Sequence, residues 1–263
     1  MNAVATPCAP SVRDRVNDAE WTVRTDLAAC YRLVARYGMS DLIYNHITAK
    51  VPGEAKHFLI NPFGLLYTEI TASCFYTLDL DGEIVSRPEG AFGEFPVNRA
   101  GFMIHSAVHG ARSDLHCVMH THTRAGAGIS LLRNGLRPIS QDALQVYDDV
   151  AYHDYGVPAS VEECEALGRT CQRGSHVVLL NHGLLSLGPT VHGAFFRMYC
   201  LERACELELI ARTLGEPPVQ VDAPVIAKAG ERMRKRRDSA EYGLAEWRGL
   251  VRTVDRAGAN YRC

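Results

Sequence analysis

Three histidines at the ends of two apolar segments constrain the fold of this chain more than any other feature. His120 and His122 follow the apolar segment 115–119, and His182 follows the largely apolar segment 176–180. Short apolar segments of this kind are consistent with buried β-strands. Alternate residues of a strand point to one face, and their Cα atoms lie about 6.5–7 Å apart. The imidazoles of His120 and His122 can therefore reach a common metal ion.

A metal site is one of two interpretations of these histidines. A chain with 11 histidines in 263 residues is expected to contain about 0.5 His-x-His pairs by chance, so the pair alone proves little. The context favours a metal, because small or turn-forming residues follow each histidine cluster. Three imidazoles would leave coordination positions open, which is typical of a catalytic metal site. We predict that His120, His122 and His182 bind one divalent metal per subunit, zinc first, with manganese or iron as alternatives.

Composition and net charge limit the classes of protein to which this chain can belong. A chain of 263 residues that is 47% hydrophobic fits one large globular domain, or a domain with an appendage. The net charge of −2 gives no electrostatic reason to expect nucleic acid as a partner. No apolar segment reaches the ~18 residues of a membrane-spanning helix, and the N-terminus lacks the pattern of a signal peptide. The nine scattered cysteines form no C-x-x-C pair, so we expect a reducing, cytoplasmic environment without a disulfide framework.

The order of apolar patterns predicts alternating helices and strands. We expect a flexible N-terminal arm (1–17), one main domain (18–215) and a charged, helical C-terminal tail (216–263). Within the domain, the patterns predict helices over 18–38, 97–111, 160–173 and 190–214, strands over 43–51, 57–60, 115–119 and 176–182, and a hairpin over 76–85 that turns at Asp81-Gly82. Hairpins dominate the strand pairing. The fold class that we predict is therefore α/β, in three α/β/α layers with a mixed, largely antiparallel central sheet.

Several ordered motifs resemble the class II aldolase/adducin family. They are N-H-I-T at 45–48, I-N-P-F-G at 60–64, a helix that contains His105, H-T-H at 120–122 and N-H-G at 181–183. The resemblance covers about residues 20–215. It implies a nine-stranded central sheet flanked by helices, a tetramer with active sites between subunits, and a divalent cation bound by the three matching histidines.

The chain departs from the aldolases of this family at the positions that move protons. The aldolases place a catalytic glutamate at the start of the helix before the H-x-H strand, and that position falls on Gly101 here. The nearest carboxylate is Glu94. The tyrosine that protonates the leaving aldehyde falls near Gln141, with Tyr147 as a candidate substitute. The pattern therefore resembles the adducin-like bacterial branch more than the sugar-phosphate aldolases.

Other residues have both a functional and a structural interpretation. The resemblance implies contacts with a substrate phosphate or carboxylate for Asn45, Thr48, Asn61 and Gly64; for Asn45 the alternative is turn capping. Arg99 could bind a carboxylate or be a solvated cation. His105 and His109, one helical turn apart, could bind metal or form a packing face. The basic cluster 232–237 fits a solvated helix or an intersubunit contact better than an anionic partner.

These features favour a metal-dependent lyase. A metal with open positions can chelate a hydroxy or keto acid and stabilise the charge that develops when a C–C bond breaks. Decarboxylation needs no base to remove a proton, so the missing glutamate matters less there than in aldol cleavage. We expect a small-molecule substrate, a homotetramer, and neither nucleic acid nor membrane as partner. The alternatives are a non-haem metal oxidoreductase and an adducin-like binding protein without turnover.

Overall fold

An eight-stranded mixed sheet forms the centre of the computed structural model, which describes residues 12–88, 90–157 and 160–263. The strands are β1 (His46–Lys50), β2 (His57–Ile60), β3 (Tyr76–Asp79), β4 (Ile84–Ser86), β5 (Cys117–Thr121), β6 (Val150–His153), β7 (His176–Leu179) and β8 (Gly183–Gly188). Their order is β4-β3-β2-β1-β5-β8-β7-β6, and only β6 and β7 pair in parallel. The mixed, largely antiparallel sheet is confirmed. The described residues form eight strands, whereas the resemblance implies nine.

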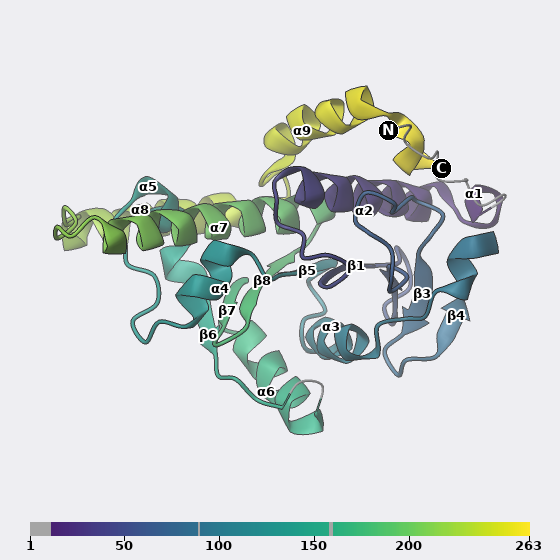
Figure 1. Cartoon of the computed structure of the whole chain (residues 1–263), viewed down its shortest axis with the longest axis horizontal. Helices are drawn as coiled ribbons and strands as arrows, with labels where there is room; N and C mark the ends of the chain where they lie inside the picture. The colour runs from purple at the N-terminus through teal and green to yellow at the C-terminus, as the bar shows by residue number, and fades with distance from the viewer. Residues whose placement is uncertain (1–11, 89, 158–159) are drawn as a thin grey trace.

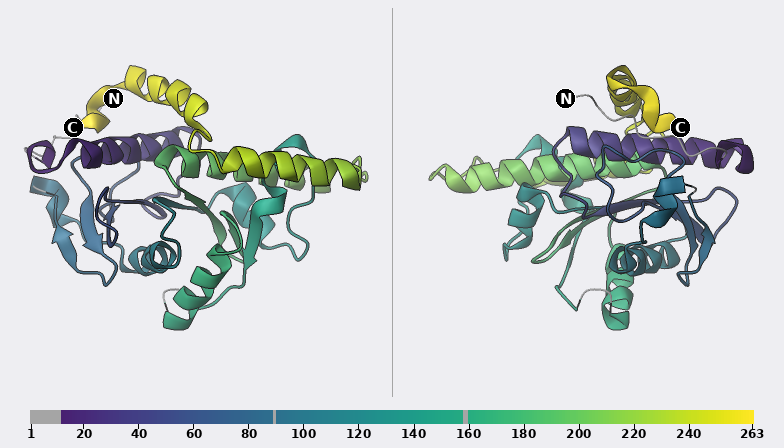
Figure 2. Two further views of the ribbon diagram at one scale, coloured as in Figure 1. Left: turned by 180° about the vertical axis from the view of Figure 1, so that it is seen from behind. Right: turned by 45° about the vertical axis from the view of Figure 1, so that its right-hand side comes forward.

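Helices cover both faces of the sheet, which confirms the α/β/α layers (Figures 1 and 2). They are α1 (Val12–Arg15), α2 (Asp18–Arg36), α3 (Arg99–Ala111), α4 (Arg124–Ser130), α5 (Gln141–Val146), α6 (Val161–Cys171), α7 (Val191–Thr213), α8 (Ala223–Arg237) and α9 (Leu244–Ala257), with short 3₁₀ turns η1 (Gly90–Glu94), η2 (Tyr147–Asp149) and η3 (Ala259–Arg262). Helices α2 and α7 lie on one face, and α3 and α6 lie on the other. None of the described helices is long and apolar enough to cross a membrane.

Strand β5 shows how the sheet separates two apolar cores. Cys117 and Met119 join the cluster beneath α2 and α7, whereas Val118 joins the cluster beneath α3 and α6. All five residues of β5 are buried. A strand that is covered on both faces is apolar at consecutive positions, because its alternate side chains enter different cores. His120 near the end of this strand and His122 just after it therefore stand at the edge of a buried, largely apolar layer.

The turns between elements account for the boundaries that differ from expectation. Strand β1 is shorter than predicted because residues 41–45 form a turn, in which Leu42 and Asn45 have positive φ angles. Helix α3 begins at Arg99 rather than at 97, because the Asn98 side chain accepts a hydrogen bond from the N–H of Gly101 (3.1 Å) and caps the helix.

The predicted two-residue turn at Asp81-Gly82 is wrong. Strand β3 ends at Asp79 and strand β4 begins at Ile84, so four residues connect them. The Asp79 carboxylate accepts hydrogen bonds from the backbone N–H groups of Asp81 and Glu83, at 3.0 and 2.9 Å. These bonds stabilise the longer connection, because they satisfy backbone N–H groups within it.

The C-terminal region packs against the main core. Trp247 and Val254 of α9 are buried, and the Trp247 ring packs edge-on against that of Phe195 in α7, with centroids 5.8 Å apart. Tyr261 is fully buried, and its carbonyl accepts a hydrogen bond from the N–H of Ala72 (2.8 Å). At the other end of the chain, the N-terminal arm is described only from residue 12, and the expectation for residues 1–11 lies outside the described residues.

Replacing Trp247 by alanine tests whether α9 stabilises the core. Removal of a buried tryptophan typically costs about 3–5 kcal/mol of unfolding free energy. We expect Trp247→Ala to lower the free energy of unfolding by that amount in a urea titration followed by far-UV circular dichroism. The matched control is Arg248→Ala, at the exposed neighbouring position, which should change it by less than about 0.5 kcal/mol. A loss below 1 kcal/mol for Trp247→Ala would contradict this packing.

Candidate metal centre

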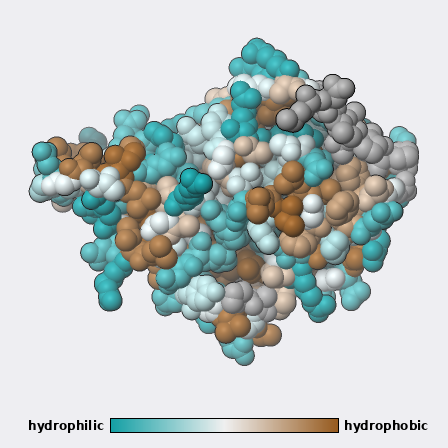
Figure 3. Space-filling model, viewed as in Figure 1, coloured by the Kyte–Doolittle hydropathy of each residue, from teal (hydrophilic) through white to brown (hydrophobic). Residues whose placement is uncertain are grey.

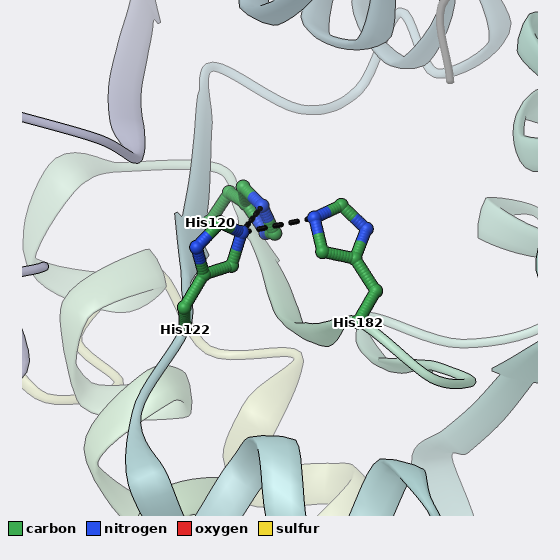
Figure 4. A group of neighbouring side chains, drawn as sticks. All are labelled: His120, His122 and His182. Carbon is green, nitrogen blue, oxygen red and sulfur yellow. Dashed lines mark hydrogen bonds between the residues drawn. The ribbon is translucent and has the colours of Figure 1, made fainter.

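Three imidazoles converge at the end of β5 (Figure 4). Strand β5 and the residue after it carry His120 and His122, and His182 lies in the turn between β7 and β8. The Nε2 atom of His122 lies 2.9 Å from the Nε2 atoms of both His120 and His182. Among the described residues, these three form the one group of at least three histidine, cysteine or carboxylate side chains with metal-ligand spacing.

The outer nitrogens of these rings determine what the inner nitrogens can do. His120 Nδ1 lies 2.9 Å from the carbonyl oxygen of Leu184, and His122 Nδ1 lies 3.2 Å from a carboxylate oxygen of Asp41. Both partners only accept hydrogen bonds, so each Nδ1 carries the proton and each Nε2 presents a lone pair. Two lone pairs 2.9 Å apart repel each other, and a cation between them removes the repulsion. Two nitrogens bound to one tetrahedral zinc ion at ~2.0–2.1 Å lie about 3.3 Å apart, so the residues would fit a divalent metal after a shift of a few tenths of an ångström.

Burial keeps the imidazoles of His120 and His182 neutral. Desolvation, followed by the neighbouring His122, lowers the pKa of His182 to about 4. Desolvation and then the other histidines lower the pKa of His120 well below its usual value. A neutral imidazole is the form that binds a metal. The site is therefore ready for a cation at neutral pH without first releasing protons from these two rings.

A tight turn positions Asp41 against His122. The N–H of Tyr44 donates to the carbonyl of Asp41 (2.8 Å), and Leu42 between them has a φ angle of +48°. A positive φ is unfavourable for a branched side chain, so the surrounding structure must stabilise this turn. Sequence reasoning missed Asp41. Its only signal is one acidic residue just before the N-H-I-T motif.

Two of the predicted substrate-binding residues are committed to interior hydrogen bonds. The Thr48 hydroxyl lies 2.7 Å from Nδ1 of His105 and 2.8 Å from Nε2 of His109, and all three side chains are buried. The Asn61 side chain accepts a hydrogen bond from the hydroxyl of Tyr31 (2.8 Å). Thr48 thus holds the two helix histidines in a packing arrangement between β1 and α3.

The other predicted residues lie around the site or on the surface. Asn45 is buried beside β1, and neither polar atom of its side chain has a hydrogen-bond partner. Gly64 has a φ angle of +118°, with the ring of Phe95 where a β-carbon would stand. The remaining three, Glu94, Arg99 and Tyr147, are exposed. None of the predicted substrate-binding and proton-transfer residues lines the two cavities that border the histidines in the described part of the chain.

The space in front of Gly101 is filled by His46. A β-carbon built on Gly101 would lie 2.6 Å from the His46 ring, so no larger residue fits without movement. His46 is the cross-strand partner of His120, and their ring centroids lie 5.6 Å apart. Both ring nitrogens of His46 are buried without a hydrogen-bond partner, and burial lowers its pKa to about 4. An imidazole from β1 therefore occupies the place where the family resemblance implies a glutamate from α3.

Two cavities border the three histidines. A wide groove of about 880 Å³ runs from His122 along α4 and α7, and Asp41, Arg124 and Ile210 contribute to its walls. A small cavity of about 20 Å³ lies on the other side, at His182. The small cavity has room for about one water molecule. Only the wide groove admits a small organic acid.

The buried histidine pair beneath the site makes stability depend on pH. Burial lowers the pKa of His109 to about 3, whereas a histidine in an unfolded chain titrates near ~6.5. The folded protein therefore binds a proton at His109 less readily than the unfolded chain does. The contribution of neutral His109 to stability is fully present above about pH 6.5 and is lost as the pH falls towards 3. The expected slope is about 1.4 kcal/mol per pH unit for this residue. The His109→Gln variant should show a shallower slope between pH 6 and 4 in urea titrations. Equal slopes for both proteins would contradict the assignment.

Comparisons with known proteins agree with this geometry. Residues 25–209 match the family profile described as "Class II Aldolase and Adducin N-terminal domain". The "Putative aldolase class 2 protein" of Caulobacter vibrioides is 40% identical over 252 residues, which cover 95% of this chain and 96% of that protein. Alpha-adducin of Mus musculus is 42% identical over 257 residues, which cover 91% of this chain but 34% of adducin.

Two solved structures share the fold over nearly the whole chain. An aldolase II superfamily protein from Pseudomonas syringae is 43% identical with a TM-score of 0.90, covering 96% of this chain and 100% of that one. The L-fuculose 1-phosphate aldolase from Glaciozyma antarctica is 27% identical with a TM-score of 0.81, covering 98% and 96%. The order of motifs, the layered sheet and these matches lead to one assignment. The chain belongs to the class II aldolase and adducin family.

Proposed function

We propose that this protein is a divalent-metal-dependent lyase that breaks a C–C bond of a small hydroxy or keto acid. The observation that carries the proposal is the convergence of three Nε2 atoms at the mouth of an open groove. Zinc is the metal that we propose first, with manganese or iron as alternatives. A bound divalent ion would act as a Lewis acid on an oxygen of the substrate.

The chain's own residues hold and orient the site. Leu184 and Asp41 fix the orientation of the two β5-derived rings through their Nδ1 atoms. Such outer contacts usually affect metal affinity by ~10–100-fold. His120 is buried, whereas the groove beside His122 is wide enough for a small organic acid, so we propose that the substrate approaches through this groove.

Arg124 supplies the positive charge that an organic acid requires. Its side chain is exposed in the same groove as His122, and it forms no ion pair among the described residues. The acidic residues of the groove already have partners: Asp41 with His122, Glu202 with Thr123, and Glu206 with Arg203. A carboxylate or phosphate of the substrate would therefore meet Arg124, with the reacting oxygens near the histidines.

The lack of a carboxylate at the position implied for proton transfer favours decarboxylation over aldol cleavage. With His46 in front of Gly101, no carboxylate occupies the position implied for the general acid/base. Loss of carbon dioxide requires no such base. Glu94 and Tyr147 remain proposals as proton donors, and both are exposed, so either would act only from the surface of a neighbouring copy or after movement.

Assembly as a homotetramer is part of the proposal. Three apolar side chains in the last turn of α7 and the segment that follows it are more than half exposed: Ile210, Leu214 and Val219. Figure 3 shows hydrophobic residues at this end of the molecule. Because Ile210 also lines the groove at His122, a second copy on this surface would lie next to the substrate. The free, mostly buried cysteines among the described residues fit our proposal of a cytoplasmic location.

The likeness to alpha-adducin supports the alternative of a binding protein without turnover. The inward-facing lone pairs favour the enzyme, because a binding scaffold has no physical need for three converging imidazoles. A binding protein that holds a metal ion and a metal-dependent enzyme have the same metal content, so activity must be measured as well.

Metal analysis tests the ligands. We expect the purified protein, saturated with zinc and then dialysed, to retain about one metal ion per chain by mass spectrometry. His182→Ala should abolish this binding, and Asp41→Asn should weaken it ~10–100-fold. The matched control is His57→Ala, which removes a histidine from β2 outside the cluster. Retention of one tightly bound ion by the His182→Ala variant would contradict the site.

Activity assays test the reaction class. General acid–base groups contribute ~10²–10⁴-fold in rate, so we expect cleavage of fuculose- or rhamnulose-type phosphates to be slow. Carbon dioxide release from a panel of 2-keto and hydroxy-aromatic acids should be faster. For the best substrate, Arg124→Gln should raise KM with little change in kcat, unlike Arg133→Gln, an exposed arginine outside the groove. Sugar-phosphate turnover near ~1–10³ per second would show that another residue replaces the glutamate.

A further inference from the structure

A second groove, between α5 and α8, shares no lining residue with the cavities at the histidines. Its volume is about 790 Å³. The two helices lie side by side in Figures 1 and 2. Apolar side chains form much of its lining, including Leu144 from α5 and Val225 and Met233 from α8. Val225 is 51% exposed, so this surface remains open to solvent in the single chain.

A row of positive charges follows one wall of this groove. Lys228, Arg232 and Arg236 line it at intervals of four residues along α8. A helix rises 1.5 Å per residue, so these positions repeat about every 6 Å. The facing wall carries the amides of Gln141 and Gln145, which are also one helical turn apart. The groove is thus cationic on one side and neutral but polar on the other.

The stability of α8 explains only part of its positive charge. Cations in the last turn of a helix interact favourably with its dipole, which accounts for the cluster 234–237. Within that cluster, Arg237 pairs with Asp148 (2.7 Å), and Lys235 pairs with Glu231 (2.9 Å). Lys228 and Arg232 precede the last turn, and neither forms an ion pair among the described residues. Their alignment in the groove therefore requires another explanation.

The groove is already formed in the free chain. Arg237 is 4% exposed and donates a hydrogen bond to the backbone carbonyl of Gln145 (2.6 Å), which joins α8 to α5. Arg197 of α7 in turn donates to the carbonyl of Arg237 (2.9 Å). The guanidinium of Arg236 lies 5.8 Å from the ring of Tyr242. Walls that are fixed before binding reduce the conformational entropy lost when a partner binds.

We propose that this groove binds an acidic amphipathic helix of another protein. Carboxylates at positions i, i+4 and i+8 of such a helix share the ~6 Å repeat of Lys228, Arg232 and Arg236. The apolar residues beside them would contact Leu144 and Met233, as when an amphipathic helix occupies a groove between two helices. Charge complementarity determines the choice of partner, because no carboxylate lines the groove and two of its three cations, Lys228 and Arg232, form no ion pair among the described residues. Arg236 pairs with Glu246 (3.4 Å) at the edge of the groove.

A designed peptide provides the test. The probe is a fluorescein-labelled, 16-residue helical peptide with glutamate at i, i+4 and i+8 and leucines on the adjoining face, titrated with the full-length protein by fluorescence anisotropy. We expect saturable binding that weakens as sodium chloride is raised. Arg232→Glu should weaken binding at least ~10-fold. Lys235→Glu, the same charge reversal on α8 outside the groove, should change it less than ~2-fold. Met233→Glu should abolish binding, and thermal melts should show that each variant is folded.

Four results would each overturn the proposal. The first is no binding of the glutamate peptide, and the second is equal binding of a peptide with lysine in place of glutamate. The third is an equal loss for Arg232→Glu and Lys235→Glu, which would indicate diffuse attraction to a basic helix. The fourth is dissociation of the protein's own oligomer by Arg232→Glu in sedimentation experiments, which would assign the groove to contact between copies of this chain.

Discussion

The repulsion between the Nε2 lone pairs of His120 and His122 is the constraint around which the candidate site is built. The protein brings these atoms together although, for His120 and His122, neither nitrogen can donate to the other. Antiparallel pairing of β5 with β8 places the Leu184 carbonyl against the first ring, and the 41–45 turn places Asp41 against the second. The sheet and the turn thus hold the two rings in an arrangement that a bound cation would stabilise further.

The same geometry defines what chemistry the site can support. One face of the cluster is closed by packed side chains, and the other opens into the groove that contains Arg124. His46 fills the space at Gly101, so the three converging histidines stand without the carboxylate that the family resemblance implies beside them. A reaction that needs charge stabilisation but no removal of a proton suits this combination better than aldol cleavage. The basic groove at α8 is a separate surface, which we propose binds a partner protein and takes no part in turnover.

Local sequence pattern was sufficient for most of the elements and for the convergence of the three histidines, but it did not predict α4, α5 or β6. Period-two geometry predicted that His120 and His122 share a face, and the apolar segments predicted strands buried on both sides. It was insufficient wherever a contact depends on how distant elements pack. Asp41 reaches His122 across 81 positions, and His46 meets Gly101 only because α3 lies against β1. The hairpin at Asp79 failed for a local reason, since a side-chain carboxylate binds backbone N–H groups within the longer connection.

The most direct test of the account is X-ray absorption spectroscopy of the zinc-loaded protein. Three imidazole nitrogens at ~2.0–2.1 Å, with oxygen at the remaining positions, are predicted from the converging rings. The His182→Ala variant should lose this spectrum altogether or show at most two imidazoles. A first shell that contains sulfur at ~2.3 Å, or a wild-type spectrum with fewer than three imidazoles, would contradict the metal centre and with it the proposed chemistry.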